Sequence, residues 1–400
     1  MLRSDPVTEN LFFGKACRRA RGWAAVPGSV SQNTDDADSV ELPPGRNFHA
    51  PMCGKNGRIR MQNSDAAVYI FHGGVAGHEN FETGLITIRA ELQNIRAEIQ
   101  KAVVGKEQVV DKVLMAILAR GHVLLEDVPG VGKTTLTLAF AKTLGLETRR
   151  IQFTSDTVPS DVVGFSVLDK ASGNFQYKPG AIMTNMLLAD EINRTSSKTQ
   201  SALLEAMEER HVTVDGVTHP LPEPFFVLAT QNPTGSAGTQ NLPNSQLDRF
   251  MIKLTMGYPD RDSQVRILRD RKKGNPIDGL KQIMTRSELV KASDQVDNIQ
   301  TDDRIYQYIT DLTEATRVHP MVSLGVSPRG ALALCRMAKA HAWISGREYT
   351  IPEDVAAVAT DVYAHRLMPG SKARFNELTG EMIMAEILEQ VKMPVLEEIK

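Results

Sequence analysis

The feature that most constrains the fold of this 400-residue chain is the short segment LEDVPGVGKTT at residues 125–135. It follows the apolar run 122–126, which is typical of a buried parallel strand, and it opens a helix. Gly130 and Gly132 allow backbone N–H groups to turn inward around phosphate oxygens, and the helix N-terminus adds its partial positive charge. The segment therefore predicts a phosphate-binding loop between a strand and a helix.

The loop also suggests ligands for a nucleotide and its metal. Lys133 is expected to reach the outer phosphates of ATP, and the Thr134 hydroxyl to ligate Mg²⁺. One departure from the GxxxxGK[ST] pattern is Asp127, which stands where the first glycine belongs. The Lys–Thr pair argues against the alternative, a glycine-rich turn that binds no phosphate. The residues expected to bind nucleotide in this loop are Pro129, Gly130, Val131, Gly132, Lys133, Thr134 and Thr135.

Two adjacent acids end a later apolar strand, MLLADE at residues 186–191. Parallel strands bring their carboxyl ends to one edge of a sheet, where open α/β folds bind ligands. Asp190 is expected to hold Mg²⁺, and Glu191 to act as the general base that polarises the attacking water. The alternative is that both acids only cap the next helix.

Two further polar residues fit the same site, each on a weaker signal. Asn232 ends the apolar strand expected at 225–230, where its amide could orient the water, although a strand-terminal Asn-Pro is also an ordinary turn. Arg329 lies in the first turn of a helix that begins at Ser327-Pro328, and it could move onto the γ-phosphate if that domain closes. An isolated arginine at such a position is usually a solvated surface residue.

Strand and helix signals alternate up to residue 258 and give way to helices afterwards. Three apolar stripes at helical spacing, which include Ile305, Val358 and Ile383, predict helices in that second part. Expected strands at 122–126, 150–153, 186–189 and 225–230 alternate with helices, which predicts a parallel sheet covered on both faces. The expected fold is an α/β P-loop NTPase core at 84–258 with a C-terminal all-helical lid domain at 259–400. Residues 1–83 show little apolar periodicity, so a disordered extension, or sequence upstream of a start such as Met61, is expected there.

Composition excludes several classes of function. The net charge of −2 offers no overall basic footprint for nucleic acid. Cys17, Cys53 and Cys335 are too far apart for a CxxC zinc site or a disulfide framework. The chain contains no apolar run of the roughly 18 residues that a membrane span requires. A cytoplasmic protein without an obligate nucleic-acid partner is the expectation.

Taken together, these residues resemble the MoxR family of AAA+ ATPases, within the helix-2-insert clade, from about Glu98 to the C-terminus. Several motifs in the right order are more specific than any one of them. The motifs are VGKE at 104–107, EDVPGVGKT at 126–134, ADEINR at 189–194, KTQSALLEAM at 198–207, ATQNP at 229–233, QLDRF at 246–250 and SPRG at 327–330. Thr195–Ser197 and Asn244 depart from the family pattern.

The resemblance implies further roles. Val104 and Gly105 would pack near adenine, Asn232 would be the sensor-1 residue and Arg329 the sensor-2 residue. Arg249 would be the arginine finger that stabilises charge on the γ-phosphate in a neighbouring subunit of a ring, by family habit a hexamer. Residues 155–179 resemble the helix-2 insert. The segment 211–219 independently predicts a hairpin, because Asp215-Gly216 is a turn signal.

Three functions remain open at this stage. The first is an ATP-driven chaperone that remodels or matures an unknown client protein, by metal or cofactor insertion, together with a von Willebrand A domain partner. The second is a nucleotide-dependent switch or scaffold with little turnover, which the presence of Glu191 and Arg249 disfavours. The third is a chelatase-type motor subunit, whose plan also includes the insert and the hairpin.

Overall fold

The computed structural model describes residues 91–395 except 129, 172, 233–241 and 273, together with the backbone of short strands between residues 39 and 76. The chain divides into two compact units, Met1–Thr83 and Gly84–Lys400. In the first unit, β1 (Ser39–Glu41) pairs with β2 (Asn47–His49), and β3 (Ile59–Asn63), β4 (Ala66–Phe71) and β5 (Gly74–Ala76) form an antiparallel sheet. The expected disorder at 1–83 stays a prediction, because most of that segment lies outside the described residues.

The second unit is built on a five-stranded parallel sheet in the order β14-β6-β13-β10-β7. The expected strands are present as β6 (Val123–Glu126), β7 (Thr148–Gln152), β10 (Met186–Asp190) and β13 (Phe226–Gln231). The edge strand β14 (Ile252–Leu254) was not expected, since three residues carry too little pattern to identify a strand. The predicted parallel α/β sheet is confirmed.

Helices cover both faces of this sheet, as the strand residues themselves require. Successive strand side chains point to opposite faces. Leu125, Leu188 and Leu228 accordingly join the core that also holds α3 (Glu107–Leu118) and α4 (Lys133–Thr143). Leu124 and Leu187 join a second core with α6 (Ser197–Glu209). Because all of these leucines are buried on one face or the other, the strands are near-continuous apolar runs rather than alternating ones.

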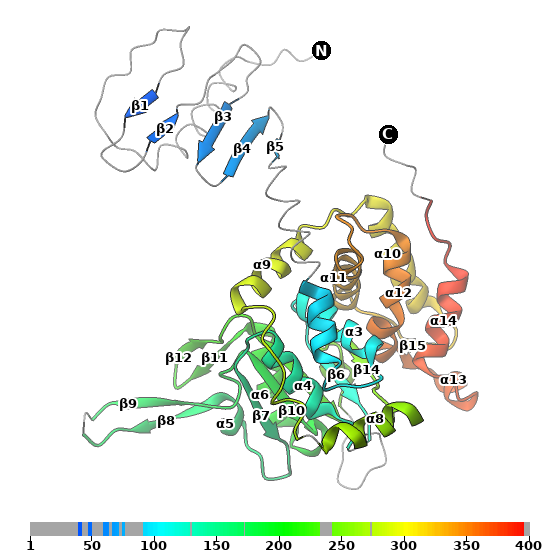
Figure 1. Ribbon diagram of the computed structural model, residues 1–400. Helices are drawn as coiled ribbons and strands as arrows, with labels where there is room; N and C mark the ends of the chain where they lie inside the picture. The colour runs from blue at the N-terminus through cyan, green and yellow to red at the C-terminus, as the bar shows by residue number, and fades with distance from the viewer. Residues whose placement is uncertain are drawn as a thin grey trace. The chain divides into compact units, whose positions relative to one another are not determined.

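Two hairpins extend from the core. The helix-2-insert segment forms the short helix α5 (Pro159–Val163) and the hairpin β8 (Gly164–Leu168) and β9 (Phe175–Pro179), which projects away from the sheet in Figure 1. The expected second hairpin is β11 (His211–Val214) and β12 (Val217–Pro220). Asp215 and Gly216 both have positive φ, 50° and 78°, as a two-residue primed turn requires. Tyr177 of β9 stacks on His219 of β12, with ring centroids 3.9 Å apart, which joins the two hairpins.

After Tyr258 the chain is predominantly helical. The apolar stripes expected on three lid helices are buried, including Ile305, Val358 and Ile383. The elements are α8 (Arg261–Arg271), α9 (Arg286–Asp297), α10 (Asp303–Val318), α11 (Pro328–Ile344), α12 (Pro352–Tyr363), η3 (Ala364–Arg366), α13 (Ser371–Phe375) and α14 (Gly380–Gln390) (Figure 1). The lid is not all-helical, however, because β15 (Val322–Leu324) pairs with β16 (Met368–Pro369). These strands are too short to leave a periodic signal. Among the described residues no helix has both the length and the apolarity for a membrane crossing.

Candidate nucleotide-binding site

The phosphate loop joins β6 to α4, as its sequence predicts. Gly130 and Gly132 have φ of 89° and 102°, values that favour glycine, and Gly132 is the N-cap of α4. Lys133 begins the helix, and its side chain, 8% exposed, donates from Nζ to the carbonyl oxygen of Asp127 at 2.8 Å. Burial lowers the pKa of this ammonium, whereas attraction to nearby carboxylates, Asp190 foremost, raises it. A buried cation among carboxylates at a helix N-terminus is arranged to meet an anion. Pro129 lies outside the described residues.

A cavity of about 310 Å³ lies beside this loop. One wall is the segment that includes Val104 and Lys106, and the opposite wall includes Met256 and Tyr258 at the beginning of the lid. Gly105, between the first two, has φ of 69°, and a Cβ there would lie 2.2 Å from the Ser263 hydroxyl of α8. The segment that the family resemblance places near adenine therefore lies beside the phosphate loop, and only glycine fits at its closest approach to the lid.

Asp127, the departure from the glycine pattern, has a structural role. Its side chain is 5% exposed, and Oδ2 accepts hydrogen bonds from the backbone N–H groups of Met256, at 2.5 Å, and Gly257, at 2.8 Å. Oδ1 accepts from the N–H of Val128 at 3.1 Å. Asp127 thus fastens the phosphate loop to the segment that leads from β14 into the lid, a bond that glycine could not make.

Replacing Asp127 by glycine, which restores the GxxxxGK[ST] pattern, is expected to destabilise the protein. Two N–H groups at 256 and 257 would lose their acceptor, at about 1–3 kcal/mol for each one that is left unsatisfied. Urea unfolding would measure the change. Asp127→Asn, which keeps one carbonyl acceptor, should lose less. A glycine variant as stable as the wild type would contradict this role.

The two acids lie at the carboxyl end of β10, where Thr230 of β13 joins them. The Thr230 hydroxyl donates to Asp190 Oδ1 at 2.6 Å and accepts from the N–H of Glu191 at 2.8 Å. Asp190 Oδ2 also pairs with Arg150 at 2.7 Å. Glu191 has a φ of 58° and precedes η2 (Ile192–Arg194), and its carboxylate pairs at 2.8 Å with Arg194, the last residue of η2. The acids are therefore oriented by a neighbouring strand and do more than cap a helix.

Asn232 is held at the end of β13 by Asn193. Asn193 Nδ2 donates to the Asn232 carbonyl at 3.1 Å, and the Asn232 N–H donates to Asn193 Oδ1 at 3.3 Å. The Asn232 side-chain oxygen is buried and has no hydrogen-bond partner among the described residues. A buried acceptor of this kind calls for a polar partner. Thr230 and Asn193 were not expected from the sequence: Thr230 reaches the acids because β13 pairs with β10, and Asn193 reaches Asn232 from η2, which follows β10.

Arg249 and Arg329 lie together, away from the phosphate loop. Both pair with Glu208 in the last turn of α6; the Arg249 contact is 2.9 Å. They line a second cavity, of about 400 Å³, with Arg210 and Arg336. Among the described residues, no side chain lines both this cavity and the one beside the phosphate loop. Arg329 was expected to approach the γ-phosphate bound by its own chain. In this structure it does not, because the start of α11 places it beside Arg249, the expected arginine finger. Its role stays a prediction.

The α/β core, the phosphate loop and the helical lid together define an AAA+ ATPase. Residues 122–252 match the family model of ATPases associated with various cellular activities (AAA), and residues 314–387 match the AAA lid domain. A crystal structure of a Cytophaga hutchinsonii protein proposed to be an ATPase has a TM-score of 0.74 and 35% identity, over 79% of this chain and 99% of that one.

Similar proteins of known name identify the family within the AAA+ ATPases. Chaperone MoxR1 of Mycobacterium tuberculosis is 37% identical, with 81% of this chain and 88% of that protein covered. Protein MoxR of Methylorubrum extorquens is 32% identical, over 74% and 93%. The uncharacterized protein YeaC of Bacillus subtilis is 49% identical, over 74% and 93%. The chain belongs to the MoxR family of AAA+ ATPases, and it is a nucleotide-binding ATP hydrolase.

Proposed function

We propose that this protein is a ring-forming, Mg²⁺-dependent ATPase of chaperone type, in which each nucleotide site is completed by arginines of the neighbouring subunit. The observation that carries the proposal is the pairing of Arg249 and Arg329 on Glu208, at a cavity distinct from the one beside the phosphate loop. Two arginines share one half-exposed glutamate at this cavity, and Arg249 also donates to the carbonyl oxygen of Leu204 at 2.7 Å. Paired guanidinium groups at a cavity are suited to an incoming phosphate. In a ring they would meet the γ-phosphate bound by the next subunit.

In this proposal Asp190, Glu191 and Asn232 of one subunit bind the metal and position the attacking water. Asp190 and Thr134 would hold Mg²⁺, because a carboxylate and a hydroxyl oxygen are the kind of ligand this ion takes from a protein when phosphates and water provide the rest. Bound Mg²⁺ would neutralise charge on the phosphates. Glu191 would take the proton of the attacking water. The unpartnered oxygen of Asn232 would orient that water.

The proposed action on a client protein is supported by membership of the MoxR family. We infer that ATP-driven motion of the lid remodels or matures a client protein, with metal or cofactor insertion as one form and a von Willebrand A domain protein as the partner. The exposed apolar side chains of the β8–β9 hairpin, Phe165 and Phe175, would face the pore or top surface of a hexamer. A cytoplasmic location is part of the same proposal.

Subunit mixing tests the shared site. Arg249→Ala and Glu191→Gln should each be nearly inactive alone, while their mixture regains turnover, because an intact Glu191 site can receive an intact Arg249. Arg329→Ala mixed with Glu191→Gln should also regain turnover if Arg329 acts between subunits. Turnover would be measured against protein concentration, with sizing in parallel. A wild type that stays monomeric at full activity, or mixtures that never exceed their components, would overturn the proposal.

A further inference from the structure

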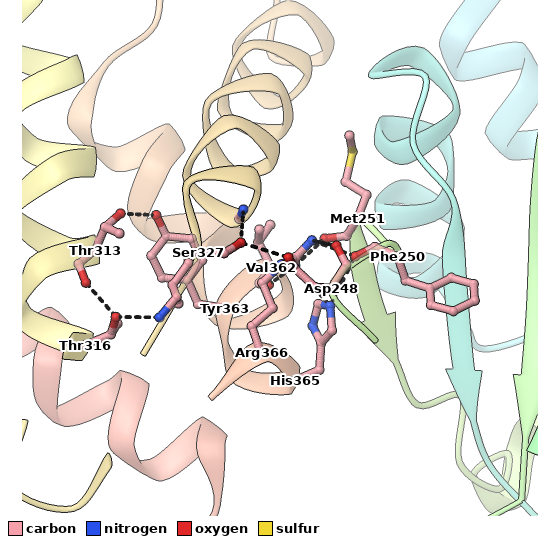
Figure 2. A network of polar contacts seen from close by, with 12 residues as sticks. Asp248, Phe250, Met251, Thr313, Thr316, Ser327, Val362, Tyr363, His365 and Arg366 are labelled. Atoms are coloured by element: carbon pink, nitrogen blue, oxygen red, sulfur yellow. Dashed lines mark hydrogen bonds and ion pairs between the residues drawn. The ribbon is translucent and has the colours of Figure 1, made fainter. Parts of the chain in front are cut away.

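Asp248 directly precedes Arg249 and connects the turn that carries it to the lid. This turn, residues 248–251, follows the short helix α7 (Asn244–Leu247). One carboxylate oxygen of Asp248, Oδ1, pairs with Nε of Arg366 in η3 at 2.8 Å. The other, Oδ2, accepts from the Ser327 hydroxyl at 2.8 Å (Figure 2). One carboxylate therefore bonds to two separate elements of the lid.

Arg366 holds the backbone of the same turn. It is only 5% exposed, and its guanidinium donates to the carbonyl oxygens of Asp248 at 3.2 Å, Phe250 at 2.7 Å and Met251 at 3.1 Å. The planar five-donor fork of arginine suits this many acceptors in one place. Figure 2 shows these bonds converging on the turn. The direction in which Arg249 leaves the turn is thereby set by a side chain of the lid.

Ser327 extends the connection to Arg329. Its hydroxyl, which donates to Asp248, also accepts from the N–H of Gly330 at 3.2 Å and so caps α11, in whose first turn Arg329 lies. The residue before Ser327 is also bonded within the lid, because the N–H of Val326 donates to the Thr316 hydroxyl at 3.0 Å. Asp248 is therefore bonded to the start of the helix that carries the second arginine.

We propose that Asp248 is a positioning residue for ATP hydrolysis, which sets Arg249 and Arg329 in a fixed arrangement toward the neighbouring subunit's nucleotide. The proposal rests on the shared-site function proposed above. Ser327 acts through the Asp248 carboxylate, and Arg366 acts both through that carboxylate and directly on the turn backbone, so movement of the lid shifts both arginines as one unit. A plain docking contact would only hold the lid to the core, as Lys112 and Asp361 do with an ion pair of 2.7 Å.

The test compares Asp248→Asn with Asp361→Asn, the same chemical change in an acid that also bonds core to lid. We expect Asp248→Asn to lower kcat by about 10- to 100-fold, as small misplacements of a catalytic group do. Its KM for ATP and its affinity for a fluorescent ATP analogue should stay within about twofold, because the phosphate loop is untouched. Asp361→Asn should keep the wild-type kcat. A mixture of Asp248→Asn and Glu191→Gln subunits should regain turnover. It would not do so if Asp248→Asn damaged the nucleotide site of its own subunit.

The control mixture separates the two proposals. If Arg249→Ala with Glu191→Gln regains turnover and Asp248→Asn with Glu191→Gln does not, the positioning role is wrong and the shared site stands. If neither regains it, the shared site itself fails. An unchanged kcat in Asp248→Asn, or an equal loss in Asp361→Asn, also overturns the positioning role. Should Asp248→Asn fail to fold, Ser327→Ala replaces it: a lower kcat with rescue supports the role, and an unchanged kcat contradicts it.

Discussion

Replacing Glu191 by glutamine is expected to lower ATP turnover by about 10²–10⁴-fold, the usual contribution of a general base. The amide keeps the shape of the carboxylate but cannot accept the proton of the attacking water. Binding of ATP should survive, since the change leaves the phosphate loop and the bond from the Glu191 N–H to Thr230 in place. The variant would therefore hold ATP without consuming it, which also makes it a trap for the client protein.

The side chain of Glu191 is accessible enough for this role. It is 17% exposed, and its partner Arg194 is 44% exposed, so their ion pair is weak and can open. Steady-state turnover and binding of a fluorescent ATP analogue would be measured on the same preparation. Glu209→Gln, the same change at the exposed end of α6, serves as the control and should behave as the wild type. Turnover within a few-fold of wild type in Glu191→Gln would place the base elsewhere.

Replacing Lys133 by alanine is expected to abolish productive nucleotide binding. Truncating one partner of a buried, hydrogen-bonded charge pair costs about 2–5 kcal/mol. The dissociation constant for ATP should therefore rise by roughly 10²–10³-fold. The ammonium is the one cation of the loop segment 125–135, and without it the attraction that balances the nearby carboxylates of Asp190 and Asp127 is lost.

Titration with a fluorescent ATP analogue would measure this loss. Lys142→Ala changes the last turn of the same helix, where the side chain bonds to the carbonyl oxygens of Ile277 and Asp278 and not to the phosphate loop, so it tests for general damage to α4. We expect Lys142→Ala to bind nucleotide normally. Wild-type affinity in Lys133→Ala would remove the main support for the phosphate site.

Much of the fold could be predicted because its signals are local. The strand–loop–helix around Gly132, the hairpin turn at Asp215-Gly216 and the apolar stripes of the lid helices each depend on residues within a few positions of one another. The structure confirms these elements. Strands of three residues, such as Ile252–Leu254, carry no such pattern, and only their pairing partners define them.

The residues of the candidate site also divide into those that a local sequence motif identifies and those that it does not. The loop and the paired acids were recognisable as motifs, because phosphate binding needs particular residues at fixed spacing. The partners that orient them, Thr230 and Asn193, come from parallel strand pairing and have no local signature. Asp127 looked like a departure from the motif, since the backbone N–H groups that donate to its carboxylate, at 256 and 257, are remote in sequence.

The sequence by itself determined the class of protein and the position of the phosphate loop, and it named the acids and arginines that we propose act at that site. Only the tertiary structure decided which of these groups lie together. It grouped Arg329 with Arg249 on Glu208 and connected both to Asp248, although 80 residues separate the two arginines in the sequence. The reason is physical: periodicity reports which face of a helix is buried, whereas the packing of the lid on the core decides where its polar residues point.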